Sequence, residues 1–341
     1  MPEAVSVEVA IIGAGPVGLF QIFELGLLGI SAHIIDSLAH PGGQCTELYP
    51  DKPIYDIPAL PIVGAQELVD RLLLQAKPFH ATFHLGQEVD ELQRRADGRF
   101  LIGTTAGTEL NAGAVVIAGG LGSFQPRRLS VPGIEQYEGT QVLYRVQSAA
   151  DLHGKDLIIC GGGDSALDWT VALCEKARSL TLLHRRAEFR AAPATVARMR
   201  ELVAAGRMQL VVGNIIALQA QGNQVQAQIH GTDGHEEARR ADHVLAFFGL
   251  HPKLGPIADW GLELDRKALK VDPEKFQTSQ PGIFAIGDIN HYPGKKKLIL
   301  SGFHEAALAA FAIQHHLFPD KRQFLQYTTT SPIMQKRLGI T

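Results

Sequence analysis

The chain carries the same glycine-rich turn twice, and this repeat limits what it can fold into. The first copy, GAGPVG at 13–18, follows an apolar run at 7–12, and the second copy, GGGDSA at 161–166, follows an apolar run at 156–160. A strand before such a turn and a helix after it let backbone N–H groups approach a pyrophosphate at the start of the helix. The sequence therefore predicts two dinucleotide-binding sites, formed by Gly13, Gly15 and Gly18 in one copy and by Gly161, Gly163, Asp164 and Ser165 in the other.

The two copies differ at the position that selects the cofactor. Asp36 stands 23 residues after the first glycine of its turn, whereas His184, followed by Arg185 and Arg186, stands at that distance in the second copy. A carboxylate at this position binds a ribose diol, and cations suit a ribose 2′-phosphate, to which the arginine fork is well matched. The simplest such pair is FAD and NADPH, with Arg190 as a further phosphate candidate. Two alternatives remain open: a turn or capping role for Asp36, and a solvated basic edge for the arginines.

The composition fits an enzyme with large buried cores. Of 341 residues, 45% are apolar and 20% are charged, and the net charge of -3 argues against a nucleic-acid binder. No apolar run reaches the roughly 18 residues of a membrane span, and the first residues lack the features of a signal peptide. Three scattered cysteines and 14 histidines show no disulfide framework and no metal-ligand spacing. We expect a cytoplasmic protein without a metal site or a membrane segment.

The order of segments predicts one domain inserted into another. We expect an α/β fold with two Rossmann-like, three-layer domains: an FAD-binding domain at 1–121 and 248–341, and an inserted NADPH-binding domain at 122–247. Within the last segment, the apolar run at 282–288 reads as a strand that completes the first sheet, and 304–316 reads as a helix.

Four motifs in order along the chain resemble the low-molecular-weight thioredoxin reductases, a branch of the flavoproteins with two dinucleotide-binding domains. These motifs are Gly42-Gly43-Gln44, the second glycine turn, the His-Arg-Arg run and Gly287-Asp288. Thioredoxin reductases also carry Cys-x-x-Cys shortly before the second turn, but the corresponding stretch at 140–148 contains no cysteine. Because dithiol chemistry needs two thiols within bonding reach, disulfide reduction by that route is excluded.

A sister branch without the dithiol, the thioredoxin reductase-like ferredoxin–NADP reductases, is similar over more of the chain. The similarity includes LYPDK at 48–52, YDIP at 55–58, GDSALDW at 163–169 and the tail QYTTTSP at 326–332. This resemblance implies electron exchange between NADPH and ferredoxin or flavodoxin, with no catalytic acid or base. It also implies a homodimer whose tail covers the flavin of the partner subunit.

The cofactors and the resemblance together assign roles to individual residues. Asp36 is expected to bind the adenosine ribose, Asp288 a ribityl hydroxyl, and Gln44 the polar edge of the isoalloxazine. The resemblance implies stacking on the flavin by Tyr49 and Tyr327, a ring contact by Thr329, an adenine contact by Val89 and a flavin contact by Phe124. Asp288 as a turn residue, Tyr49 as a core aromatic and Tyr327 as a surface aromatic are the alternatives, and Thr328, Thr330 or Ser331 could replace Thr329.

Other interpretations of the surface and of the activity also remain open. Lys295-Lys296-Lys297 is the densest cationic run, and it forms either a solvated loop or a docking contact for an acidic protein. The alternative functions are an NADPH oxidase or quinone-type reductase on the same scaffold, and a non-enzymatic NADPH-sensing flavoprotein.

Overall fold

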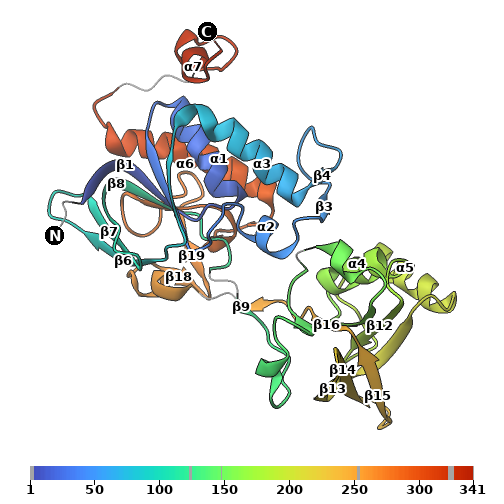
Figure 1. Ribbon diagram of the computed structural model, residues 1–341. Coiled ribbons are helices and arrows are strands. Elements are labelled where there is room, and N and C mark those ends of the chain that lie inside the picture. Colours follow the sequence, from blue (N-terminus) through green and yellow to red (C-terminus); the bar gives the residue numbers. More distant parts are fainter. Residues whose placement is uncertain (1–3, 123–124, 147, 252–253, 322–325, 341) are drawn as a thin grey trace. The chain divides into compact units, whose positions relative to one another are not determined.

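A computed structural model describes the chain except for residues 1–3, 123–124, 147, 252–253, 322–325 and 341 (Figure 1). The described residues form two compact units. The first combines the residues before 123 with those after 253, and the second spans 125–251. The second unit thus begins and ends a few residues after the expected limits of 122 and 247. Phe124 lies outside the described residues.

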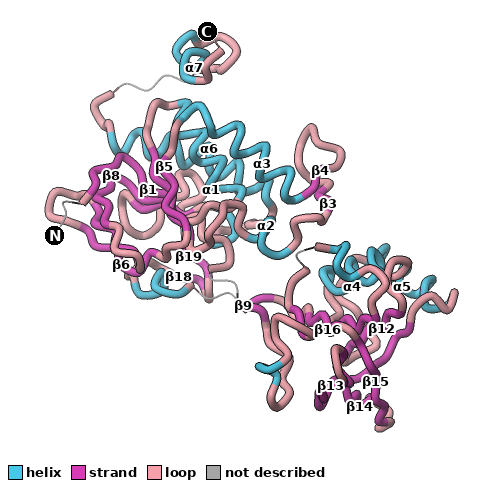
Figure 2. Tube along the Cα trace, in the orientation of Figure 1, coloured by secondary structure: helices cyan, strands magenta, loops and turns pink. Residues whose placement is uncertain are grey.

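The first unit is a sheet with helices packed on one of its faces (Figure 2). Its N-terminal part contains β1 (Val5–Ile12), α1 (Pro16–Leu27), β2 (Ala32–Asp36), α2 (Gln44–Leu48), β3 (Pro53–Ile54), β4 (Val63–Gly64), α3 (Ala65–Ala76), β5 (Thr82–Leu85), β6 (Val89–Arg94), β7 (Phe100–Thr104) and β8 (Glu109–Ile117). Its C-terminal part contains β18 (Leu264–Asp265), β19 (Ala268–Lys270), β20 (Ile283–Ala285), β21 (Asn290–His291), α6 (Ile299–Leu317) and α7 (Pro332–Arg337). Its described residues also form the short 3-10 helices η1 (Lys77–Phe79), η4 (Gly255–Asp259) and η5 (Gly287–Ile289).

The sheet of the first unit mixes parallel and antiparallel pairs. Its order is β5-β2-β1-β8-β7-β6, with β20 also paired to β8. The pairs of β1 with β2 and β8, of β2 with β5 and of β20 with β8 are parallel, whereas β6, β7 and β8 form an antiparallel meander. The parallel pairing of β20 with β8 confirms that the third segment of the chain completes the first sheet. Helix α6 begins five residues before the expected position 304.

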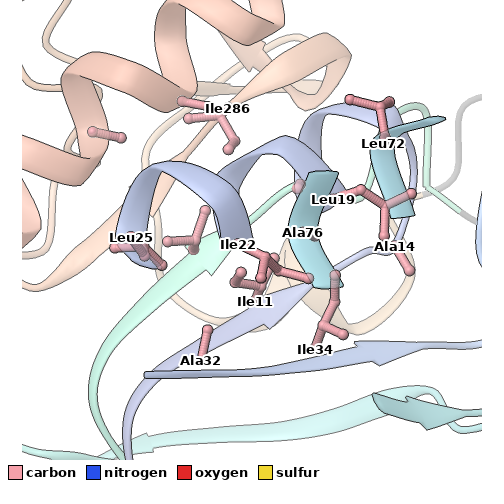
Figure 3. Packing of buried hydrophobic residues seen from close by; sticks show 14 of the residues in the cluster. Ile11, Ala14, Leu19, Ile22, Leu25, Ala32, Ile34, Leu72, Ala76 and Ile286 are labelled. Carbon is pink, nitrogen blue, oxygen red and sulfur yellow. The ribbon is translucent and has the colours of Figure 1, made fainter. Parts of the chain in front are cut away.

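Both faces of this sheet are buried, which explains why its strands are almost continuously apolar. Ile11 and Ile34 on one face pack beneath α1 and α3, where Leu19 and Ile22 of α1 cover them (Figure 3). On the opposite face, Ile35 packs in a second cluster with residues of β6, β7 and η4. Two cores on one sheet make the three-layer arrangement that the sequence predicts.

The second unit has the same plan. Its elements are β9 (Gln125–Pro126), η2 (Ile134–Gln136), β10 (Val142–Leu143), η3 (Ala149–Leu152), β11 (Asp156–Cys160), α4 (Asp164–Leu173), β12 (Ser179–His184), α5 (Pro193–Ala204), β13 (Gln209–Gln221), β14 (Gln224–Gly231), β15 (Glu236–Ala241), β16 (His243–Ala246) and β17 (Leu250–His251). The sheet order is β10-β16-β11-β12-β13-β14-β15, parallel up to β13 and antiparallel beyond it. Leu167 of α4 and Met199 of α5 pack on one face, and Ile158 contributes to a core on the other.

Candidate functional site

A pocket of about 230 Å³ lies in the first unit, lined by segments that are far apart in the sequence. These are the turn after β1, the end of β2, the start of α2, the residues before β6, the loop after β8, part of η4, and the loop from η5 to the start of α6. The predicted residues that line it are Gly13, Gly15, Asp36, Gln44, Tyr49, Val89 and Asp288. Because strand ends and helix starts meet here, the pocket has the position of a ligand site in an α/β sheet.

The first glycine turn leaves space for a ligand at the start of α1. Gly13 has φ +111°, and a Cβ there would lie 2.5 Å from the Ala118 carbonyl oxygen. A Cβ at Gly15, by contrast, would have no neighbour within 4 Å, and no side chain caps α1. Open space beside uncapped N–H groups fits an anionic diphosphate. Gly18 does not line the pocket. A Cβ there would lie 2.0 Å from the Gly13 carbonyl oxygen, so this glycine permits close packing of the helix.

Asp36 is held by the backbone of its own site. The Ala14 N–H donates to Oδ2 at 2.6 Å, and the Leu38 N–H donates to Oδ1 at 2.8 Å. Burial raises the pKa of Asp36, while these two N–H groups and His40 oppose the rise. The carboxylate therefore ties the end of β2 to the glycine turn, and each oxygen keeps a lone pair for a hydroxyl ligand.

The segment from Gly42 to Tyr49 packs against the same turn. The Gly42 N–H donates to the Ala14 carbonyl at 2.8 Å, and the next residue, the N-cap of α2, has φ +55°. This places Gln44 and Tyr49 in the pocket lining. The Sγ of Cys45 lies 3.9 Å from the Tyr49 hydroxyl, and burial raises the pKa of this thiol to about 11. Cys45 is therefore protonated at neutral pH and packs as a small apolar side chain.

Asp288 lies in η5 and lines the pocket together with the glycine turn and the start of α6. Burial raises the pKa of its carboxyl, whereas Lys297 and Lys295 oppose the rise. The pocket lining continues through Lys297 and Leu298 to Ile299, the first residue of α6. The positive end of this helix dipole thus lies at the pocket, where it favours a negative charge.

The structure corrects one interpretation of the lysine run. Lys295 is not at the surface, because its side chain is 3% exposed and forms an ion pair with the fully buried Glu305. Lys296 and Lys297 are exposed. An exposed docking contact can therefore involve these two lysines but not Lys295.

The tail does not reach the pocket of its own chain. Tyr327 is 65% exposed, Thr329 is also exposed, and neither lines the pocket. In α7, Arg337 donates to the Leu27 carbonyl at the end of α1. The flavin contact expected of Tyr327 and Thr329 therefore involves a second chain, and it stays a prediction.

The second glycine turn repeats the geometry of the first. Gly161 has φ +149°, and a Cβ there would lie 2.5 Å from the Phe247 carbonyl oxygen. A Cβ at Gly163 would meet nothing within 4 Å, and α4 has no side-chain cap. Asp164 and Ser165 are the first two residues of α4. This turn therefore also presents open space at a helix start.

The loop after β12 is tied to this second turn. The Arg190 N–H donates to the Gly162 carbonyl at 2.8 Å, and the Ala192 N–H donates to Asp164 Oδ1 at 2.9 Å. With one oxygen bound to Ala192, Asp164 serves as an anchor for the loop. A carboxylate would also repel a diphosphate, so its bonding fits this anchoring role better than direct contact with the ligand.

His184, the last residue of β12, is packed, whereas the three arginines that follow it are free. The His184 ring fills the space beside Gly162 and lies against Phe189, with 5.2 Å between the ring centroids. Burial lowers the pKa of His184, and the neighbouring arginines lower it further. Arg185, Arg186 and Arg190 are exposed, and within the described residues none of them forms an ion pair. The arginines are therefore available to a phosphate, while His184 is a neutral wall of the site.

Two features of the sites escape sequence patterns. One is the buried pair of Lys295 and Glu305, for which the one available signal was that Glu305 is the only acidic residue of α6. The other is the bond between Asp164 and Ala192, for which the sequence gives no signal. Within the described part of the chain, no three side chains of the metal-ligating types converge, and no helix is long and apolar enough to cross a membrane.

The chain is similar to known proteins over almost its whole length. It is 58% identical to "Ferredoxin--NADP reductase 2" of Cupriavidus metallidurans, over 99% of this chain and 92% of that protein. It is 58% identical to "Ferredoxin--NADP reductase" of Methylibium petroleiphilum, over 98% and 93%. The fold matches the thioredoxin reductase of Lactococcus lactis with a TM-score of 0.77 at 21% identity, covering 92% of this chain and 99% of that chain.

The family follows from a match that includes both glycine turns, the strand β20 and most of helix α6. Residues 7–313 match the family described as pyridine nucleotide-disulphide oxidoreductase. This chain therefore belongs to the pyridine nucleotide-disulphide oxidoreductase family and is an oxidoreductase.

Proposed function

We propose that the chain binds FAD and NADPH and transfers electrons between NADPH and ferredoxin, as a ferredoxin–NADP reductase. The names of its relatives at 58% identity support this activity over an oxidase, a quinone reductase or a sensor. One observation carries the cofactor assignment: two glycine turns of the same geometry are followed by opposite charges, a held carboxylate in one unit and free arginines in the other.

In the first unit, FAD would lie in the pocket that the glycine turn, Asp36 and Asp288 line. The N–H groups at the start of α1 bind the diphosphate, and Asp36 accepts hydrogen bonds from the adenosine ribose. Asp288 accepts one from the ribityl chain, Gln44 and Tyr49 contact the ring, and Val89 contacts the adenine.

In the second unit, NADPH would bind at the turn that precedes α4. Gly161, Gly163 and Ser165 receive the diphosphate, Arg185 and Arg186 bind the 2′-phosphate, and Arg190 assists them. Asp164 and His184 shape this site through the contacts described above.

The chemistry needs no acid or base from the protein. A bound flavin supplies the change from two-electron hydride transfer to one-electron transfer. The residues of the chain orient the cofactors and exclude side reactions. The Cys45 thiol takes no part, because its pKa of about 11 keeps it protonated.

The partner would meet the mouth of the pocket. Lys297 and Leu298 line the pocket and are exposed, Leu298 to 44%, and the neighbouring Lys296 is also exposed. Exposed cations favour association with an acidic protein such as ferredoxin or flavodoxin. The free, buried cysteines fit a reducing compartment, and we propose the cytoplasm.

The tail would act in a homodimer, with Tyr327 and Thr329 over the flavin of the partner subunit. Their exposure leaves them available for such a contact. A chain truncated after Gln326 should retain FAD but show altered rates of hydride transfer. Unchanged pre-steady-state kinetics, or a monomer in sedimentation, would remove this part of the proposal.

Anaerobic stopped-flow spectroscopy tests the activity. The protein should release FAD on denaturation, and NADPH should bleach its flavin absorbance. Mixing the reduced protein with ferredoxin should restore the absorbance faster than mixing with a quinone or with oxygen. Release of FMN, no bleaching by NADPH, or faster reoxidation by a quinone would each contradict the proposed function.

A further inference from the structure

Glu305 is a fully buried carboxylate beneath the pocket. It lies in the second turn of α6, and its exposed fraction is 0%. Oε2 accepts from the Gly287 N–H at 2.7 Å and from Asn290 Nδ2 at 2.8 Å. Oε1 accepts from the Tyr292 hydroxyl at 2.9 Å and from Lys295 Nζ. Four donors saturate the lone pairs of the carboxylate.

Lys295 completes a clamp on a single residue of the pocket wall, Gly287, by binding the peptide unit on its C-terminal side while Glu305 binds the one on its N-terminal side. Its Nζ donates both to Glu305 and, at 2.9 Å, to the Gly287 carbonyl. Glu305 binds the N–H of Gly287 and Lys295 binds its C=O, so both polar groups of this residue are fixed. Gly287 has φ +77°, and Asp288 is the next residue. The pair therefore fixes the backbone that carries the Asp288 carboxylate.

Stability alone does not account for such a pair. Removing two charges from water carries a desolvation penalty that can exceed their attraction, and neutral side chains of similar volume often stabilise a fold equally well. A charged pair with saturated hydrogen bonds does, however, define one geometry more strictly than apolar packing. What this pair offers the fold is a fixed orientation of the turn.

We propose that Lys295 and Glu305 are positioning residues of the flavin site, which hold the Gly287 turn so that Asp288 meets the ribityl chain of FAD. The proposal rests on the proposed function, because it presumes that FAD occupies this pocket. Neither residue touches the cofactor. Both act through Asp288, and loss of the clamp lowers the affinity for FAD.

The test is a double-mutant cycle on FAD affinity, measured by titrating apoprotein with FAD and following the quenching of flavin fluorescence. Lys295→Met should weaken binding about tenfold, equivalent to ~1.4 kcal/mol. In the Asp288→Ala background, the same change should alter the dissociation constant by less than about twofold, because the group that the clamp positions is gone. The proposal would be overturned if Lys295→Met lowered FAD affinity equally in the wild-type and Asp288→Ala backgrounds, or if Lys295→Met alone did not lower it.

Lys295→Met leaves Glu305 without its cation and could prevent folding. The neutral double variant Lys295→Met/Glu305→Gln leaves no unpaired charge and carries the same test. It should keep the thermal midpoint of the apoprotein close to that of the wild type and still bind FAD about tenfold more weakly. Wild-type affinity in this variant would contradict the proposal.

Two tyrosine variants serve as matched controls. Tyr292→Phe removes one donor to Glu305 but leaves both bonds to Gly287, so it should weaken FAD binding less than Lys295→Met does. Tyr137→Phe removes a buried hydroxyl bonded to the Leu218 carbonyl in the other unit and should leave FAD affinity unchanged. A loss with Tyr292→Phe as large as with Lys295→Met would favour a general packing role. If the wild-type protein binds no FAD, the proposed function fails, whereas an additive cycle defeats only this inference.

Discussion

The two glycine turns share a backbone geometry, but the groups expected to select the cofactor differ. One group is already hydrogen-bonded, and the others are free. In the first unit, Asp36 is partly buried and both of its oxygens already accept backbone N–H groups. In the second, Arg185 and Arg186 are exposed and have no carboxylate partner within the described residues. A neutral diol has no net charge with which to order a mobile acceptor, so its acceptor is fixed in advance. A phosphate attracts free cations strongly enough to order them when it binds.

The helices that follow the turns also differ, in how closely each packs against its turn. In the first unit, Gly18 lets α1 approach so closely that a Cβ would lie 2.0 Å from the Gly13 carbonyl oxygen. In the second unit, Ala166 occupies the matching position and is fully buried. The first turn thus packs more tightly against its helix than the second. We expect the first site to be part of the folding core of the first unit. The second site should depend less on the core of the second unit.

The largest effect is expected from Asp36→Ala, and it should appear even without a cofactor. The change leaves the Ala14 and Leu38 N–H groups without their charged acceptor. Each such bond contributes ~1.5–3 kcal/mol, so we expect a loss of about 2–4 kcal/mol in this partly solvated site. Urea unfolding of the apoprotein, followed by the fluorescence of Trp260 in the Trp169→Phe background, measures it. An apoprotein as stable as the wild type would show that Asp36 is not held in advance.

The double variant Arg185→Ala/Arg186→Ala should weaken the recognition of NADPH without changing the stability of the apoprotein. Loss of two charge-assisted bonds to the 2′-phosphate, at ~1.5–3 kcal/mol each, should raise the KM for NADPH by about 10²-fold or more. The KM for NADH should stay within about twofold, and the apoprotein should lose less than ~0.5 kcal/mol, as expected of surface substitutions. Steady-state kinetics with both coenzymes checks this. Equal losses for the two coenzymes would place these arginines elsewhere.

Asp164→Ala should have a smaller effect, because it frees the loop that carries Arg190 without removing an arginine. One hydrogen bond contributes ~0.5–1.5 kcal/mol, so the KM for NADPH should rise about twofold to tenfold. Asp233→Ala is a matched control, since Asp233 accepts the His235 N–H at 3.0 Å in another loop of the same unit. A lower KM for NADPH in Asp164→Ala would indicate repulsion of the phosphates instead of anchoring.

The smallest effect concerns acid stability and should occur in both units. Burial lowers the pKa of His33 and His84, which lie 3.0 Å apart through their ring nitrogens, and it also lowers the pKa of His184. A lowered pKa means that the folded state binds fewer protons than the unfolded state. The contribution of these neutral histidines to the free energy of unfolding is therefore fully present above pH 6.5, the unperturbed histidine pKa. It is lost as the pH falls below that value.

Single histidine variants should separate the two units in this respect. His84→Gln should reduce the acid-induced loss when unfolding is followed at Trp260, and His184→Gln should do so when it is followed at Trp169 in the Trp260→Phe background. Thermal unfolding between pH 5 and pH 8 provides the measurement. Identical pH profiles in the wild type and both variants would exclude these histidines as the cause.

The sequence alone determined the features that depend on short stretches of chain. Glycines at fixed spacing after an apolar run specify a strand, a tight turn and a helix, because the backbone angles of that turn are open chiefly to glycine. The distance from each turn to Asp36 or to the arginines follows from the lengths of one helix and one strand, so counting could place Asp36 at the end of β2 and the arginines directly after β12. The apolar run at 282–288 likewise predicted a strand of the first sheet, and β20 confirms it.

Only the tertiary structure decided which polar side chains meet. Lys295 reads as part of a solvated cationic run, yet the loop after η5 turns it inward onto Glu305. Asp164 reads as a ligand of the cofactor, yet the loop after β12 brings the Ala192 N–H to it. Tyr327 is expected over the flavin of a partner subunit, and only the structure shows that it lies exposed within one chain. A hydrogen bond needs two groups within about 3 Å, and that distance depends on the path of the whole chain between them.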